Sequence, residues 1–80
     1  MGKSKKEEPQ DPRLLRVGEK LKKLRISKGY TSYEQFAFEH NLPRSGYGDH
    51  EKGKNMTLNS LLRILDIHNI KMSDFFDDLD

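Results

Sequence analysis

The apolar residues of this chain recur at three- and four-residue intervals, the spacing of an amphipathic helix, and no segment alternates like a strand. The first apolar stripe comprises Leu14, Val17, Leu21 and Leu24. It predicts a helix over residues 12–28. Asp11 can act as the N-cap acceptor, and Pro12 suits the first helical turn. Gly29 stands where a helix commonly ends.

A short second helix is predicted next. Ser32 followed by Gln35 forms a capping box, which indicates a helix start. The helix is expected to run to about His40 and to bury Phe36 and Ala37.

A turn and a third helix follow. Asn41 tolerates the left-handed backbone conformation, and Leu42 is the apolar residue that fills the turn. Pro43 then starts a helix over residues 44–52, which Gly53 ends.

The last two elements are a fourth helix and a final helical turn. Thr57 caps the fourth helix and Asn69 closes it. The predicted buried face of that helix consists of Leu58, Leu61, Leu62, Leu65 and His68. Ser73 is expected to cap the final turn, which carries Phe75, Phe76 and Leu79. The pattern therefore predicts an all-α, five-helix bundle.

Length and composition limit the class of protein. The chain has 80 residues, 32% hydrophobic and 35% charged, which fits one small domain. No segment approaches the ~20 apolar residues of a membrane-spanning helix. The lack of cysteine excludes a disulfide scaffold and a cysteine-ligated zinc site. His40, His50 and His68 match no metal-ligand spacing. We expect a cytoplasmic protein that is not an enzyme, uses no cofactor or metal and binds no membrane.

Positive charge is concentrated at the start of the chain. The net charge is +2, but ten of the fifteen Lys and Arg residues lie within residues 1–28. Residues 1–11 are expected to form a disordered basic N-terminal arm ahead of a helix-turn-helix domain over residues 12–80. Such a basic end indicates a polyanionic partner, most simply nucleic acid. A solvated surface with a basic tail is the alternative.

Residues 32–54 follow the order of a helix-turn-helix motif, in which a turn with a left-handed residue joins two short helices. Ala37 is small enough for the helices to cross closely, and Asn41 permits the turn. Helical spacing points Tyr47, His50 and Glu51 toward the core or its edge. The second helix of the motif can therefore present its other face to a DNA major groove.

Several short elements follow one another at regular spacing between residues 13 and 76: Leu24-Arg25 to Gly29, Phe36-Ala37, Asn41-Leu42, Arg44-Ser45, Glu51-Lys52-Gly53-Lys54, Thr57-Leu58 with Leu61-Leu62 and Ile64, and Ile70-Lys71-Met72-Ser73-Asp74-Phe75-Phe76. Their order and spacing resemble the phage-repressor-like (Cro/repressor, XRE-type) helix-turn-helix family. It implies a sequence-specific DNA-binding transcriptional regulator. It also implies a largely buried ion pair between Arg25 and Glu51. Gly46 and Gly48 depart from the family pattern by weakening the third helix.

Helical spacing also assigns the residues that contact double-stranded DNA. One stripe of the third helix consists of Arg44, Ser45, Gly48, Asp49 and Lys52. Arg44 suits a guanine edge, and Ser45 suits a base or a phosphate. Asp49 can accept from a cytosine amino group, orient Arg44, or simply face solvent. Predicted phosphate contacts are Tyr33, Lys52, Lys54, Arg13 and Arg16, with a solvated surface as the alternative for the lysines.

A module of this size makes few DNA contacts, so we expect a homodimer on a two-fold site. Phe75, Phe76 and Leu79 are candidates for the dimer contact, with core completion as the alternative for Phe75 and Leu79. Two other functions stay open. An antitoxin of the same fold also binds a toxin protein, for which the acidic residues 74–80 suit a basic partner. A protein-interaction module that has lost DNA binding is the other alternative.

Overall fold

The computed structural model describes residues 11–79, which contain five helices and no strand. In chain order the helices are α1 (Pro12–Ser27), α2 (Tyr33–Glu39), α3 (Arg44–Glu51), α4 (Leu58–His68) and α5 (Met72–Phe76). The predicted all-α, five-helix class is confirmed. Within the described residues, none of the helices has the length and apolar character needed to cross a membrane.

The arm predicted for residues 1–11 falls almost entirely outside the described part of the chain. Its last residue, Asp11, belongs to the fold instead. Asp11 is the N-cap of α1, and its side chain accepts a hydrogen bond of 2.9 Å from the backbone amide of Arg13. The boundary of the folded region therefore includes the capping residue, because the cap satisfies an amide that the helix itself cannot.

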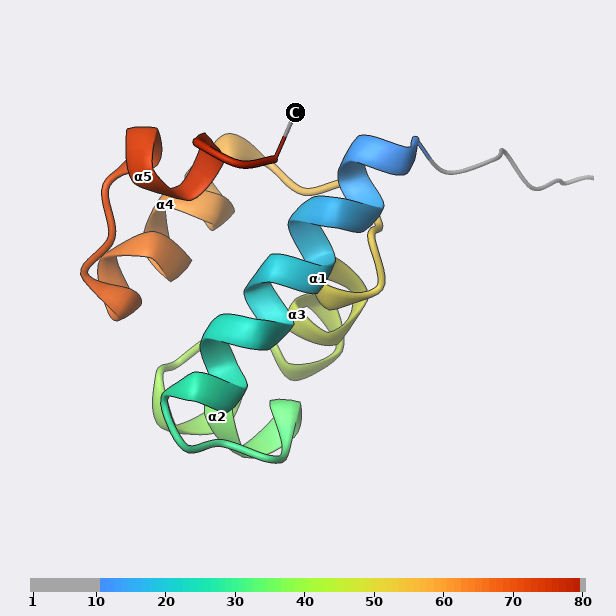
Figure 1. Ribbon diagram of the computed structural model, residues 1–80. Coiled ribbons are helices and arrows are strands. Elements are labelled where there is room, and N and C mark those ends of the chain that lie inside the picture. The colour runs from blue at the N-terminus through green and yellow to red at the C-terminus, as the bar shows by residue number, and fades with distance from the viewer. Residues whose placement is uncertain (1–10, 80) are drawn as a thin grey trace, which may run out of the picture.

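α1 is the central helix, as Figure 1 shows. α2 lies at its C-terminal end and α3 packs against it, while α4 and α5 lie together on another side. The hydrophobic core draws on every helix and on the α2–α3 turn. Its buried members are Leu21, Phe36, Ala37, Leu42, Tyr47, Leu61, Ile64, Leu65 and Phe75.

The turn between α2 and α3 forms as predicted. Asn41 has a φ of 60°, and Leu42 is buried beside it at 9% exposure. Arg63 of α4 donates a hydrogen bond of 3.1 Å from Nη2 to the Asn41 carbonyl, a contact that no local pattern predicted. The turn is therefore held from both sides, by the core beneath it and by a side chain of a later helix.

Only half of the predicted capping box forms at the start of α2. The Ser32 hydroxyl accepts the Gln35 amide at 3.2 Å, as expected. The side chain of Gln35, however, donates to Glu39 at 3.0 Å. Because Glu39 lies one turn further along the same helix, it holds the Gln35 amide group, whose Oε1 would accept the backbone N–H of Ser32 in a complete capping box.

The predicted inner face of α4 is partly wrong. Leu58 is 59% exposed and Leu62 is 37% exposed, whereas Ile64, absent from the prediction, is 2% exposed. The apolar residues of this helix cover more than one face, so their spacing does not decide which edge is inside. The predicted cap of the last helix is also wrong, because α5 begins at Met72, ahead of Ser73, and its N-cap is Lys71.

Candidate nucleic-acid interface

The inner side of α3 is fixed to the core by Tyr47. Its side chain is 1% exposed and its ring lies 5.1 Å from that of Phe36, measured between centroids. Burial raises the pKa of the Tyr47 hydroxyl well above its ordinary value, and the carboxylate of Glu51 adds to this. The hydroxyl therefore stays protonated, and Tyr47 acts as an uncharged anchor for the helix.

The end of α3 is joined to α1 by the ion pair that the family resemblance implied. Arg25 Nε lies 2.8 Å from Glu51 Oε2, and Arg25 Nη2 lies 3.0 Å from Glu51 Oε1. The two side chains are 5% and 7% exposed. Arg25 also donates from Nη1 to the Tyr30 carbonyl at 2.9 Å. The hydrogen bond to Glu51 is the main cause that raises the pKa of Arg25.

Gly18, which the sequence analysis did not single out, lets α1 approach the end of α3. A Cβ atom at this position would stand 2.6 Å from the carbonyl oxygen of Glu51 and 2.7 Å from that of His50. A side chain of any size would push the two helices apart. The available signal was a glycine in the middle of an otherwise regular helix.

The outer side of α3 presents Arg44 and Ser45, both exposed as predicted. Asp49 is half-buried, and no hydrogen bond or ion pair joins its carboxylate to Arg44 within residues 11–79. Of the three roles considered for Asp49, orienting Arg44 is therefore not seen in this structure. The Arg44 guanidinium projects from the first residue of the helix.

The predicted outer stripe needs one correction, because Gly48 is buried. The ring of Tyr33, the first residue of α2, lies directly on it. A Cβ atom at Gly48 would stand 2.5 Å from Cε1 and 3.0 Å from Cζ of Tyr33. Helical spacing within α3 does not reveal this, because the covering side chain comes from another helix. The Tyr33 hydroxyl has no hydrogen bond within residues 11–79.

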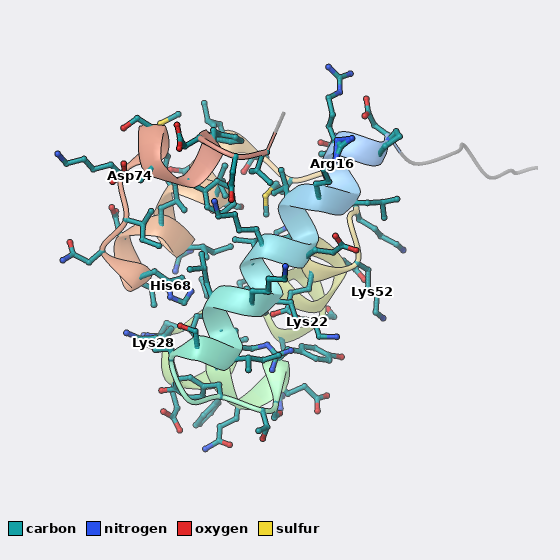
Figure 2. The ribbon with its side chains drawn as sticks, in the orientation of Figure 1. Arg16, Lys22, Lys28, Lys52, His68 and Asp74 are labelled. Atoms are coloured by element: carbon teal, nitrogen blue, oxygen red, sulfur yellow. The ribbon has the colours of Figure 1, made fainter. Side chains whose placement is uncertain are left out.

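The other predicted phosphate contacts do not all gather at α3. Lys52 and Lys54 follow this helix and are exposed, on either side of Gly53, which rests against Leu15 of α1. Figure 2 shows Lys52 at this end of α3 and Arg16 near the start of α1.

The two arginines of α1 have other neighbours. Arg16 lines a groove of α1 together with Lys20, Asp78 and Leu79. The guanidinium of Arg13 binds the carboxylate of Asp11 at 3.1 and 2.8 Å. The structure therefore places Tyr33 and Arg44 at α3 but puts Arg13 and Arg16 elsewhere.

The histidines lie at the edge of the core. His40, His50 and His68 are half-buried, and the ring of Phe36 stacks on that of His68 at 5.4 Å between centroids. Among residues 11–79, no three His, Cys, Asp or Glu side chains are grouped so as to hold a metal ion.

Comparison with known proteins gives a consistent set of relatives. No family model matches the chain. The chain is 40% identical over 67 residues to the control protein C.MunI of Mycoplasma sp. The match covers 82% of this chain and 90% of that protein.

Two solved structures are similar as well. The restriction-modification controller protein C.AhdI from Aeromonas hydrophila has a TM-score of 0.71 and 33% identity, over 82% of this chain and all (100%) of the other. The controller protein C.Esp1396I, solved as a tetramer in complex with its natural 35 base-pair operator, has a TM-score of 0.73 and 30% identity. That match covers 88% of this chain and 92% of the other.

Proposed function

This chain belongs to the restriction-modification controller proteins, and on that premise we propose that it is a sequence-specific transcriptional regulator of a restriction-modification system, which binds operator DNA by inserting α3 into the major groove. We place it, with these relatives, within the wider phage-repressor-like helix-turn-helix proteins. Its function is DNA binding rather than catalysis.

The observation that carries this proposal is the two-sided environment of α3. Tyr47 and the Arg25–Glu51 pair hold the inner side and the end of the helix, while Arg44 and Ser45 at its start are exposed. A helix anchored in this way, with an exposed arginine at its N-terminal end, is suited to the O6 and N7 edge of guanine. Lys52 and Lys54 at the other end supply phosphate contacts that set the register.

Selection of bound sequences from a random duplex pool tests this function. We expect the wild-type chain to enrich one two-fold motif, and Arg44→Ala to relax the preference at one position of each half-site. Lys54→Ala, as a matched comparison, is expected to weaken binding to all sequences alike and to reduce its salt dependence. Failure of the wild-type chain to enrich any motif at low ionic strength would contradict the proposal.

We propose that the chain binds as a homodimer through an apolar surface of α4 and α5, which we call the dimer surface. It consists of Leu58, Leu62, Met72 and Phe76, which are 59%, 37%, 44% and 40% exposed. Leu62 and Met72 line the same groove between the two helices. Of the residues that the sequence suggested for the dimer contact, Phe76 belongs to the surface. Phe75 is buried in the hydrophobic core, and Leu79 packs against that core.

A further inference from the structure

Gly48 is the residue of α3 on which the Tyr33 ring rests, and we propose that it is a positioning residue that holds the Tyr33 hydroxyl in place to donate a hydrogen bond to a phosphate oxygen of bound DNA. The inference rests on the proposed function, because the contact forms only with a duplex present.

The first argument is the space above Gly48. A Cβ atom would stand 2.5 Å from Cε1, 3.0 Å from Cζ and 3.1 Å from Cδ1 of Tyr33, so any other residue would displace the ring. Cβ atoms essentially never come within 3.0 Å of such neighbours. The ring therefore touches the backbone of α3 with no side chain between them, and Gly48 is required for that position.

The second argument is the side of α3 on which the ring lies. Gly48 follows Arg44 by four residues, so the two positions are neighbours on one face of the helix. The Tyr33 ring takes the place that a side chain at position 48 would fill. It thereby extends the face that begins with Arg44, although it comes from α2.

The third argument is the free hydrogen-bonding capacity of Tyr33. Its hydroxyl has no partner within residues 11–79, although the ring is partly buried against the core. A phenol with a fixed ring and an unused donor loses little freedom when it binds an acceptor. About half or more of the hydrogen bonds at protein–DNA interfaces go to phosphate oxygens and sugars, and tyrosine is among their donors.

Gly46 offers a contrast within the same helix. Among residues 11–79, the contact that a Cβ atom there would make is with the Cβ of Pro43, at 3.5 Å, which is an ordinary distance. Alanine therefore fits at position 46 but not at position 48. Since both substitutions replace glycine inside a helix, both raise its helical propensity, and they differ mainly in their effect on Tyr33.

The test measures affinity for two duplexes, one enriched from a random pool by the wild-type chain and one of random sequence. Tyr33→Phe keeps the ring and removes the donor, so we expect about tenfold weaker binding to both duplexes. Gly48→Ala displaces the ring and is expected to cost about the same factor. Gly46→Ala is expected to stay within about twofold of wild type, since it leaves Tyr33 in place.

The double variant Tyr33→Phe/Gly48→Ala separates positioning from a general effect on the helix. If Gly48 acts through the hydroxyl, the double variant binds about tenfold more weakly than wild type, with no further loss. A loss of about a hundredfold, the product of the two, would overturn the proposal, as would unchanged binding by Tyr33→Phe. A loss confined to the enriched duplex would also overturn it, because a phosphate contact carries no sequence information.

Melting followed by circular dichroism checks that each variant is folded. If Gly48→Ala does not fold, Gly48→Ala/Tyr33→Ala removes the obstructing ring, and it must then fold and bind like Tyr33→Ala. If the proposed function itself is wrong, the wild-type chain enriches no duplex from the random pool. That result is distinct from a change in affinity that is confined to the variants.

Discussion

Arg25 donates two parallel hydrogen bonds to the carboxylate of Glu51, from Nε at 2.8 Å and from Nη2 at 3.0 Å. The two side chains are almost completely buried, so neither charge reaches water if its partner is removed. The pair joins α1 to the end of α3, and its geometry fixes where the proposed DNA-reading helix stands relative to the core.

Glu51→Ala is therefore expected to lower the free energy of unfolding by about 3–5 kcal/mol, because it leaves the Arg25 guanidinium buried without its anion. Urea denaturation followed by circular dichroism measures this. The double variant Arg25→Met/Glu51→Leu, which removes both charges and keeps the volume, should recover much of the loss. An unchanged midpoint for Glu51→Ala would show that the pair contributes nothing.

Lys20 connects α1 to the end of the described chain. Its Nζ lies 2.7 Å from the Phe75 carbonyl and 2.6 Å from Oδ1 of Asp78, and 5.3 Å from the Phe75 ring centroid. Lys20→Met keeps the apolar stem but leaves the carbonyl without its donor. We expect the free energy of unfolding to fall by about 1–2 kcal/mol, and the amides of α5 to exchange faster with solvent.

Two variants serve as controls for Lys20→Met. Asp78→Asn should have a smaller effect, because the Asp78 side chain is 73% exposed and its charge is screened by water. Lys23→Met removes an exposed lysine from the same helix and should leave the melting midpoint nearly unchanged. Equal effects of Lys20→Met and Lys23→Met would mean that the contact with Phe75 does not stabilise α5.

Most of the fold was predictable because its signals are local. Asn41 and Asn69, both expected at helix ends, have φ values of 60° and 56°. Asp11, Ser32 and Thr57 accept backbone amides at the predicted helix starts. Such signals involve residues two or three positions apart, whose geometry depends little on the rest of the chain.

The parts that could not be predicted depend on contacts between distant residues. Leu58 and Leu62 carry the same apolar signal as Leu61, and only the packing of the helices decides which of them is buried. The exposure of Arg44 followed from helical spacing, but the covering of Gly48 by Tyr33 depends on how α2 crosses α3. The pattern of residues along the sequence does not specify the angle at which two helices cross.

His68 makes stability depend on pH. Burial lowers its pKa, and the nearby charges of Lys28 and His40 lower it further. Figure 2 shows His68, the last residue of α4, near Lys28, the C-cap residue of α1. Burial also lowers the pKa of His50, against the opposing effect of Asp49. The folded state therefore binds fewer protons at these sites than the unfolded chain does.

The sign follows from linkage. The contribution of these histidines to the free energy of unfolding is complete above the histidine pKa of the unfolded chain, about 6.5. It is lost as the pH falls through and below that value. The melting midpoint should thus drop between about pH 7.5 and 5, and the drop should be smaller in His68→Gln. The carboxylates of Asp78 and Glu39, whose pKa values are lowered, lose their contribution only at more acidic pH. A pH dependence unaffected by His68→Gln would assign the effect to other groups.

The dimer surface is tested by placing a charge within it. Leu62→Asp should leave the fold intact, since this side chain is already 37% exposed, but it should convert the chain to a monomer, because a carboxylate is costly to bury without a partner. Light scattering after size-exclusion chromatography measures the mass in solution. The loss of the dimer should also weaken binding to a two-fold operator far more than binding to a single half-site.

Phe38→Asp provides the matched control for Leu62→Asp. Phe38 is 72% exposed on α2, more than any member of the dimer surface, and it lies on a different helix. If general apolar exposure caused association, Phe38→Asp would reduce the mass as much as Leu62→Asp does. We expect it to remain dimeric, because Phe38 lies outside the proposed dimer surface of α4 and α5.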